Sequence, residues 1–122
     1  MKPELSNMTV GQLVERFITI ALDQDEAILD GRYAKFNRLY DQMENVEAEL
    51  KLRGDDQRQA LLPLLKHSNA QVRLKAAIAT LALAPMAARE ALQVISDRNE
   101  YPQAADARGM ISALDDGTYR PN

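Results

Sequence analysis

The stretch LLPLLKHSNAQVRLKAAIATLALAP, residues 61–85, decides the fold class. It holds two apolar runs separated by the polar segment KHSN, and within each run the apolar residues recur at the spacing of a helix. Asn69 is a favoured N-cap residue, so we expect the second run to form a helix from there to about Ala84, where Pro85 stops it. The stretch therefore predicts two helices joined by a short turn.

The composition of the whole chain agrees with a helical fold. The 122 residues, with 46% hydrophobic content, suffice for one compact domain with a continuous core. Aromatic residues are only 5%, Trp is absent, and Ala and Leu dominate the apolar set, which favours closely packed helices. The absence of Cys excludes disulfides, thiolate metal ligands and a thiol nucleophile.

The charge distribution limits the classes of partner. The net charge is -3, and residues 23–56 carry five basic and ten acidic side chains. Without an overall positive field, general binding to nucleic acids is disfavoured. No segment approaches the ~20 apolar residues of a membrane span, and the N-terminus has no uninterrupted apolar signal region. We therefore expect a soluble cytoplasmic protein.

The first helix is predicted after a short tail, residues 1–8. Thr9 followed by Gln12 fits a capping box, and apolar residues then recur at helical spacing. We expect this helix to stop at Gly31, although residues 23–25 offer an alternative break.

The second helix is predicted from Arg32 onward, with Gly54 in the position that ends it. Together with the first helix it forms a long N-terminal hairpin over residues 9–54. One face of this helix is expected to carry the mostly apolar residues Tyr33, Phe36, Tyr40, Met43, Val46, Glu47 and Leu50.

Four shorter helices are predicted in the rest of the chain. Asp55 or Asp56 can cap a third helix, in which Pro63 removes one backbone hydrogen bond and should cause a kink or an early first turn. After the helix capped by Asn69, further helices are expected over residues 86–96 and from Pro102 to before Gly117, with an irregular tail over residues 117–122.

A weak internal repeat relates residues 55–85 to the more degenerate residues 86–116. At an offset of 31, Ala60, Leu61 and Leu64 match Ala91, Leu92 and Ile95. At an offset of 33, Val72, Lys75, Ile78 and Leu81 match Ala105, Arg108, Ile111 and Leu114. The change of offset falls in the loop, where an insertion is tolerated, so stacked helical hairpins are expected.

The segments LLPLL and VRLKAAIATL, with the polar turn between them, resemble a HEAT repeat of the HEAT and armadillo class of α-solenoids. The whole chain is also similar to a family of small bacterial HEAT-like proteins with no assigned function. The resemblance implies an α-α superhelix of about six helices, in which Arg73 has a structural role and turns back toward acidic groups of a hairpin turn. Such repeats often carry an aspartate, the usual partner of the arginine, at the position of His67. In this chain Asp97 or a carbonyl group would take the place of that aspartate as the partner of Arg73.

Few residues are candidates for chemistry. His67 is the only histidine, and it lacks the neighbours of a metal site or a catalytic triad, so turn chemistry is its commoner role, with a general base or a pH-sensitive contact as alternatives. Asp23, Glu26 and Asp30 share one helix face, which is either a solvated stripe, a cation site or an acidic face for a basic partner. The glycines form no phosphate-binding loop.

The predicted function is protein binding without a chemical step, a cofactor or a metal. In α-solenoids the second helices of the hairpins line a concave surface, which would present Lys75 and Arg108, either as contacts or as solvated cations. Tyr101 is expected to be partly exposed, like Tyr119, and can anchor a contact. The alternatives are a nucleic-acid-handling HEAT-like protein, a structural homo-oligomer, and a small enzyme that uses His67.

Overall fold

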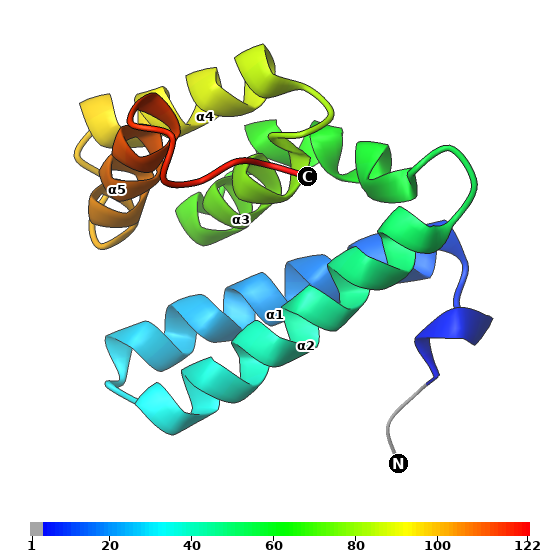
Figure 1. Cartoon of the computed structure of the whole chain (residues 1–122). Helices are drawn as coiled ribbons and strands as arrows, with labels where there is room; N and C mark the ends of the chain where they lie inside the picture. Colours follow the sequence, from blue (N-terminus) through cyan, green and yellow to red (C-terminus); the bar gives the residue numbers. More distant parts are fainter. Residues whose placement is uncertain (1–3) are drawn as a thin grey trace. The chain divides into compact units, whose positions relative to one another are not determined.

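The structure is a computed structural model that describes residues 4–122, and within that range it contains helices and no strand. The elements are the 3-10 helix η1 (Leu5–Asn7), the α-helices α1 (Val10–Leu29) and α2 (Tyr33–Leu52), the 3-10 helix η2 (Gln57–Lys66), and the α-helices α3 (Ala70–Thr80), α4 (Pro85–Asp97) and α5 (Gln103–Asp115) (Figure 1). The predicted all-α fold of about six helices is confirmed. Residues 1–3 of the predicted tail lie outside the described residues.

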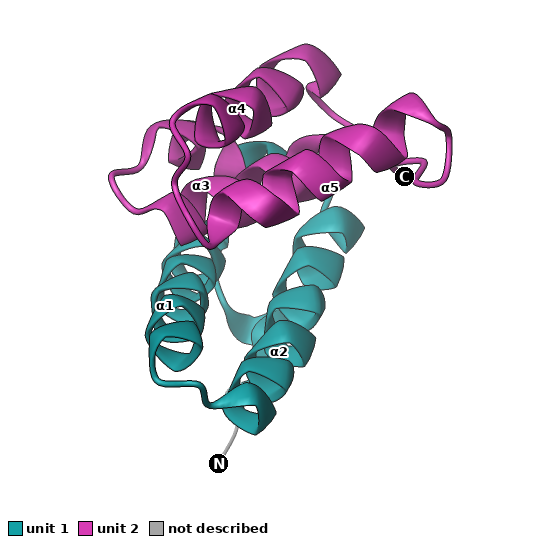
Figure 2. Cartoon of the chain, turned by 90° about the vertical axis from the view of Figure 1, so that its left-hand side faces the viewer, with its two compact units in different colours: residues 1–60 teal, residues 61–122 magenta. Residues whose placement is uncertain are grey.

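The chain divides into two compact units, residues 1–60 and residues 61–122 (Figure 2). The boundary falls inside η2. Unit 1 holds η1, α1 and α2, and unit 2 holds α3, α4 and α5. None of the helices in the described part of the chain has both the length and the apolar character needed to cross a bilayer.

The hairpin of α1 and α2 begins and turns as the sequence predicts. The backbone N–H of Gln12 donates to Oγ1 of Thr9 over 3.1 Å, and the backbone N–H of Thr9 donates to Oε1 of Gln12 over 2.9 Å, which completes a capping box. Residues 23–25 do not interrupt α1. Gly31 follows with φ +69°, a left-handed conformation that glycine adopts without steric cost.

The buried face of α2 is narrower than predicted. The core of unit 1 consists of Leu13, Phe17, Ile20, Ala21 and Ala27 from α1, and of Leu39, Met43, Val46 and Leu50 from α2. Tyr33 and Tyr40, expected in this core, are 77% and 45% exposed. The buried residues of α2 follow i, i+4, i+7 and i+11, a stripe that one neighbouring helix can cover, and both tyrosines lie outside it.

The helix α2 ends at the predicted place, with Gly54 directly after the C-cap residue Arg53. Gly54 follows the helix but is not left-handed, whereas Asp55 and Asp56 have φ of +63° and +49°. Aspartate tolerates the left-handed region better than most residues. An N-cap residue is extended, so neither Asp55 nor Asp56 has the backbone conformation of the predicted N-cap. Instead Asp56 pairs with Arg58, whose Nη2 lies 2.7 Å from Oδ2, and this hydrogen bond lowers the pKa of Asp56.

An arginine after α2 holds the N-terminal segment in place. Nη2 of Arg53 donates to the carbonyl oxygens of Leu5, over 3.1 Å, and Met8, over 2.8 Å. Nε of the same side chain donates to Oε2 of Glu49 over 2.8 Å. One guanidinium group therefore connects η1 and the residue that follows it to the C-terminal end of α2.

The predicted third helix is a 3-10 helix, η2, and not an α-helix. Pro63 lies inside it. Proline has no N–H to donate, and its ring collides with the carbonyl group four residues earlier in an α-helix, so it disfavours α-helix at this place. The kink expected at Pro63 is therefore a change of helix type over the whole segment.

Unit 2 has a core in which α4 packs against both α3 and α5. One cluster of buried apolar residues in this unit consists of Leu74, Ala77, Leu81, Ala88, Leu92, Ile95, Ala104 and Ala107. A buried hydrogen bond of 3.0 Å runs from Nε2 of Gln103 to Oε1 of Gln71 and joins α5 to α3. The helix α3 ends at Thr80, four residues before the predicted end, and a turn follows in which the Thr80 carbonyl oxygen accepts the N–H groups of Leu83 and Ala84.

Candidate functional site

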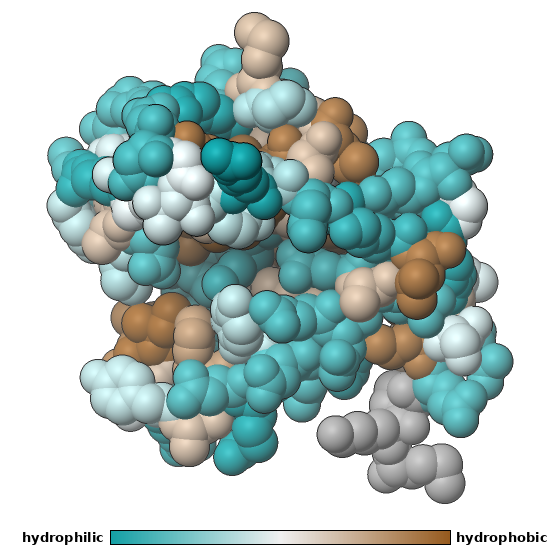
Figure 3. Space-filling model, in the orientation of Figure 1, coloured by the Kyte–Doolittle hydropathy of each residue, from teal (hydrophilic) through white to brown (hydrophobic). Residues whose placement is uncertain are grey.

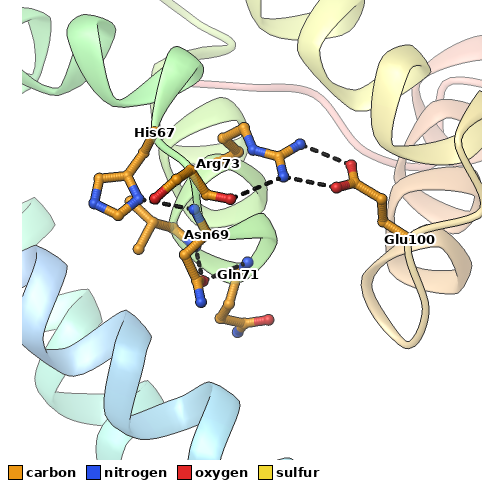
Figure 4. Close-up of polar contacts among 7 residues, drawn as sticks. His67, Asn69, Gln71, Arg73 and Glu100 are labelled. Atoms are coloured by element: carbon orange, nitrogen blue, oxygen red, sulfur yellow. Dashed lines mark hydrogen bonds and ion pairs between the residues drawn. The ribbon is translucent and has the colours of Figure 1, made fainter.

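The turn between α4 and α5, residues 98–102, is held by arginines from two helices. From α3, Arg73 reaches Glu100, with Nη1 2.7 Å from Oε2 and Nη2 2.7 Å from Oε1 (Figure 4). This bidentate pair is partly buried, with side chains 12% and 26% exposed. The hydrogen bonds from Arg73 lower the pKa of the Glu100 carboxyl group, and the carboxylate raises the pKa of Arg73.

The partner of Arg73 is therefore Glu100, three residues beyond the Asp97 that the sequence suggested. Nη2 of Arg73 also lies 3.5 Å from the carbonyl oxygen of Ser68, in the turn that precedes α3. The guanidinium group thus connects the turn before α3 to the turn after α4 (Figure 4). A planar fork of donors suits this arrangement better than an ammonium group would.

The turn before α3 is closed by its own side chains. Oδ1 of Asn69 accepts the N–H groups of Gln71, over 2.9 Å, and Val72, over 3.1 Å, and this caps the helix. Nδ1 of His67 accepts the N–H group of Asn69 over 3.0 Å (Figure 4). One ring nitrogen of His67 thus takes part in the turn.

Arg108 of α5 holds the same α4–α5 turn from the other side. Its Nε donates to Oγ of Ser96 over 2.9 Å, and its Nη2 donates to the carbonyl oxygen of Ser96 over 2.7 Å. Nη2 also donates to Oδ1 of Asn99 over 2.7 Å, and Nη1 donates to the hydroxyl group of Tyr101. A cation at the end of α4 is favourable, because the last carbonyl groups of a helix lack partners and carry partial negative charge.

Tyr101 is the exposed aromatic residue of this turn. Its side chain is 60% exposed, its hydroxyl group accepts from Arg108, and the guanidinium carbon lies 5.4 Å from the ring centroid. This distance is within the range of a cation–π interaction. The ring is therefore presented to solvent and held by a side chain that is itself bonded to Ser96 and Asn99.

The three predicted contact residues are placed differently from one another. Arg108 and Tyr101 are exposed and bonded to each other, whereas Lys75 is half-buried on α3 and has interactions of its own. The sequence pattern did not reveal Ser96, Asn99 and Glu100, the residues that the two arginines bind. The sequence held one signal for this turn, the dipeptide Asn99-Glu100 shortly before a proline. Asparagine is one of the few residues that readily adopt a positive φ, and Asn99 has a φ of +53°.

The acidic face of α1 gives no metal site. Asp23 is half-buried, and Glu26 and Asp30 are exposed. Within residues 4–122, no group of three or more histidine, aspartate or glutamate side chains is arranged to hold a metal ion. The reading as an acidic face for a basic partner stays a prediction.

Comparison with known proteins places the chain in a wider group. The family described as Domain of unknown function (DUF2019) matches residues 11–115. The chain is also similar to the protein RPA1889 from Rhodopseudomonas palustris CGA009, whose crystal structure it matches with a TM-score of 0.95 and 45% sequence identity. That match covers 99% of this chain and 100% of the other. The chain matches no curated protein.

Proposed function

The chain belongs to the DUF2019 family, and we propose that it is a non-enzymatic binding module whose protein partner contacts the α4–α5 turn. The observation that carries the proposal is the state of Tyr101, which is 60% exposed yet bonded to Arg108. Tyrosine and arginine are enriched among the residues that dominate the energy of protein interfaces.

Preorganisation is the physical reason for choosing this turn. A partner that buries a free aromatic side chain must also immobilise it, which costs about 0.5–1.5 kcal/mol for each flexible side chain. Tyr101 is already held by Arg108, and Arg108 by Ser96 and Asn99. Glu100, in the same turn, is fixed by Arg73. A partner therefore meets a turn whose conformation is already determined.

The bonding of the cations supports a protein partner over a nucleic acid. Nucleic-acid binding relies on lysine and arginine side chains that neutralise phosphates. In this chain Arg53, Arg58, Arg73 and Arg89 each form an ion pair with a carboxylate, and Arg108 bonds to the α4–α5 turn. A nucleic acid would have to compete with these contacts at each of these five arginines.

We propose further that unit 2 is a divergent pair of HEAT-type hairpins in a cytoplasmic protein. The support for HEAT-type hairpins is Arg73, which directly follows Val72 and connects the turn before α3 to the turn after α4. The repeat at an offset of 33 gives weaker support than Arg73 does. Its matched residues Val72 and Ala105 differ in burial, since Val72 is fully buried and Ala105 is exposed.

The proposal is tested by affinity capture from an extract of the native cell at near-physiological salt. We expect one protein to be retained by the wild type and lost by Tyr101→Ser. Met86→Ser is the matched control, because Met86 is 86% exposed on α4 of the same unit and should retain the partner. Capture of the same protein by all three chains, or by none, would exclude the α4–α5 turn as the binding site.

A further inference from the structure

We infer that the tip of the α1–α2 hairpin, residues 29–34, is a self-association surface that pairs with the same tip of a second copy of this chain. This surface consists of residues of unit 1 alone and shares no residue with the α4–α5 turn of unit 2. All six residues of the tip are exposed. Leu29 and Tyr33 are 76% and 77% exposed, so the tip presents two large apolar side chains to solvent.

The sequence of the tip is symmetric in character about Gly31. It reads Leu29, Asp30, Gly31, Arg32 and Tyr33, so an apolar residue and a charge stand on each side of the glycine, with opposite signs. A contact across a twofold axis brings the same patch of both copies together and must be self-complementary. Such a contact can place Asp30 of each copy opposite Arg32 of the other.

The charges continue this pattern along both helices. Near the end of α1, Glu26 and Asp30 are exposed, and near the start of α2, Arg32 and Arg38 are exposed. Among the described residues, none of these four side chains takes part in an ion pair or a side-chain hydrogen bond. An acidic helix end therefore lies next to a basic one with both sets of charges available.

The helix dipoles make these positions unfavourable within one copy. The C-terminal end of a helix carries partial negative charge and the N-terminal end partial positive charge. The last turn of α1 holds no basic residue, and the first turn of α2 holds no acidic one. A second copy would bring cations to the end of α1 and carboxylates to the start of α2, which corrects both mismatches. Because of this charge complementarity, a second copy of the chain is the partner that fits the tip best.

The surface view agrees with a mixed patch. At the lower left of Figure 3, where Figure 1 places the turn between α1 and α2, apolar brown atoms lie directly beside hydrophilic teal ones. Interfaces between proteins commonly combine an apolar centre with a polar rim. Leu29 and Tyr33 supply the centre, and the four charges supply the rim.

Sedimentation equilibrium of the full chain tests the inference. We expect the average mass to rise with concentration from 13.6 kDa toward twice that value, and to fall again when salt is added. A wild type that stays monomeric to about 1 mM at low salt, which corresponds to a binding free energy of about -4 kcal/mol, would overturn the inference.

Charge exchange distinguishes this surface from others. The variant Glu26→Lys, Asp30→Lys replaces the two exposed acidic side chains with basic ones, and the variant Arg32→Glu, Arg38→Glu replaces the two exposed basic side chains with acidic ones. Each alone should dimerise at least about tenfold more weakly than the wild type, because like charges then meet across the axis. An equimolar mixture of the two should recover the dimer. If either variant dimerises like the wild type, or if the mixture stays monomeric, the tip is not the interface.

Matched controls separate this outcome from that of the proposed function. Leu29→Ser should weaken the dimer, whereas Leu52→Ser, at a residue that is 83% exposed at the other end of α2, should leave it unchanged. Tyr101→Ser, in unit 2, should also leave the dimer unchanged while it abolishes partner capture. Equal effects of the two leucine changes would count against the tip, whatever the capture experiment gives.

Discussion

The ion pair of Arg73 and Glu100 should stabilise the folded protein by an amount that its burial and geometry define. Exposed ion pairs contribute about 0.2–1 kcal/mol, and loss of one partner of a fully buried pair costs about 3–5 kcal/mol. This pair has two bonds of 2.7 Å and side chains 12% and 26% exposed, so it lies between these limits. We expect a coupling energy of about 1–2 kcal/mol.

A double-mutant cycle measures that energy. Denaturant unfolding of the wild type, Arg73→Gln, Glu100→Gln and the double variant gives the coupling energy without the contribution of the arginine stem to packing. Arg73→Lys adds a geometric test, because lysine keeps the charge but cannot form two parallel bonds. It should recover less than the full coupling. A coupling energy below about 0.5 kcal/mol, which is ordinary for an exposed pair, would refute the account of this contact.

Three further predictions concern stability. Asn69→Ala removes the cap of α3 and should lower the free energy of unfolding by about 1 kcal/mol, measured by denaturant unfolding, and Asn69→Asp should restore most of it. Leu64→Ala removes a side chain that is 8% exposed and should cost about 2–5 kcal/mol, whereas Leu52→Ala, at an 83% exposed residue, should cost less than about 0.5 kcal/mol. Equal costs would contradict the packing of η2. Because the pKa of Glu100 is lowered by Arg73, its stabilisation is full above the ordinary value of 4.5 and is lost as the pH falls through the folded pKa. The stability difference between wild type and Glu100→Gln, followed by unfolding at a series of pH values, should therefore shrink only below about pH 4.5, and a difference that grows there would contradict the assignment.

Local signals in the sequence predicted much of the helical framework. The capping box at Thr9 and the end of the first helix at Gly31 depend on a few adjacent residues, and both are confirmed. The type of η2 was harder to predict, because a single proline can kink an α-helix or convert a segment to a 3-10 helix, depending on what packs around it. The exposure of Tyr33 was missed because helical spacing shows which residues share a face but not how wide a face the neighbouring helix covers.

The site depended on contacts between residues far apart in the sequence. Arg73 was noticed from its place after a valine, but its partner lies 27 residues away, in a loop that the repeat pattern does not align. Arg108 was expected as a cation on an open surface, and the structure places it against Ser96 and Asn99. The bonding capacity of an arginine is evident from sequence, whereas the carbonyl groups and carboxylates within its reach are set by the tertiary fold.

The central claim is that Tyr101, held in place by Arg108, is the anchor for a protein partner. It is tested most directly by the affinity of the captured partner for purified wild type, Tyr101→Ser and Arg108→Gln. We predict a loss of at least about 2 kcal/mol, or roughly 30-fold, for Tyr101→Ser. For Arg108→Gln, which keeps the ring but releases it, we predict a smaller loss of about 0.5–1.5 kcal/mol. Equal affinities for all three folded chains would contradict the claim.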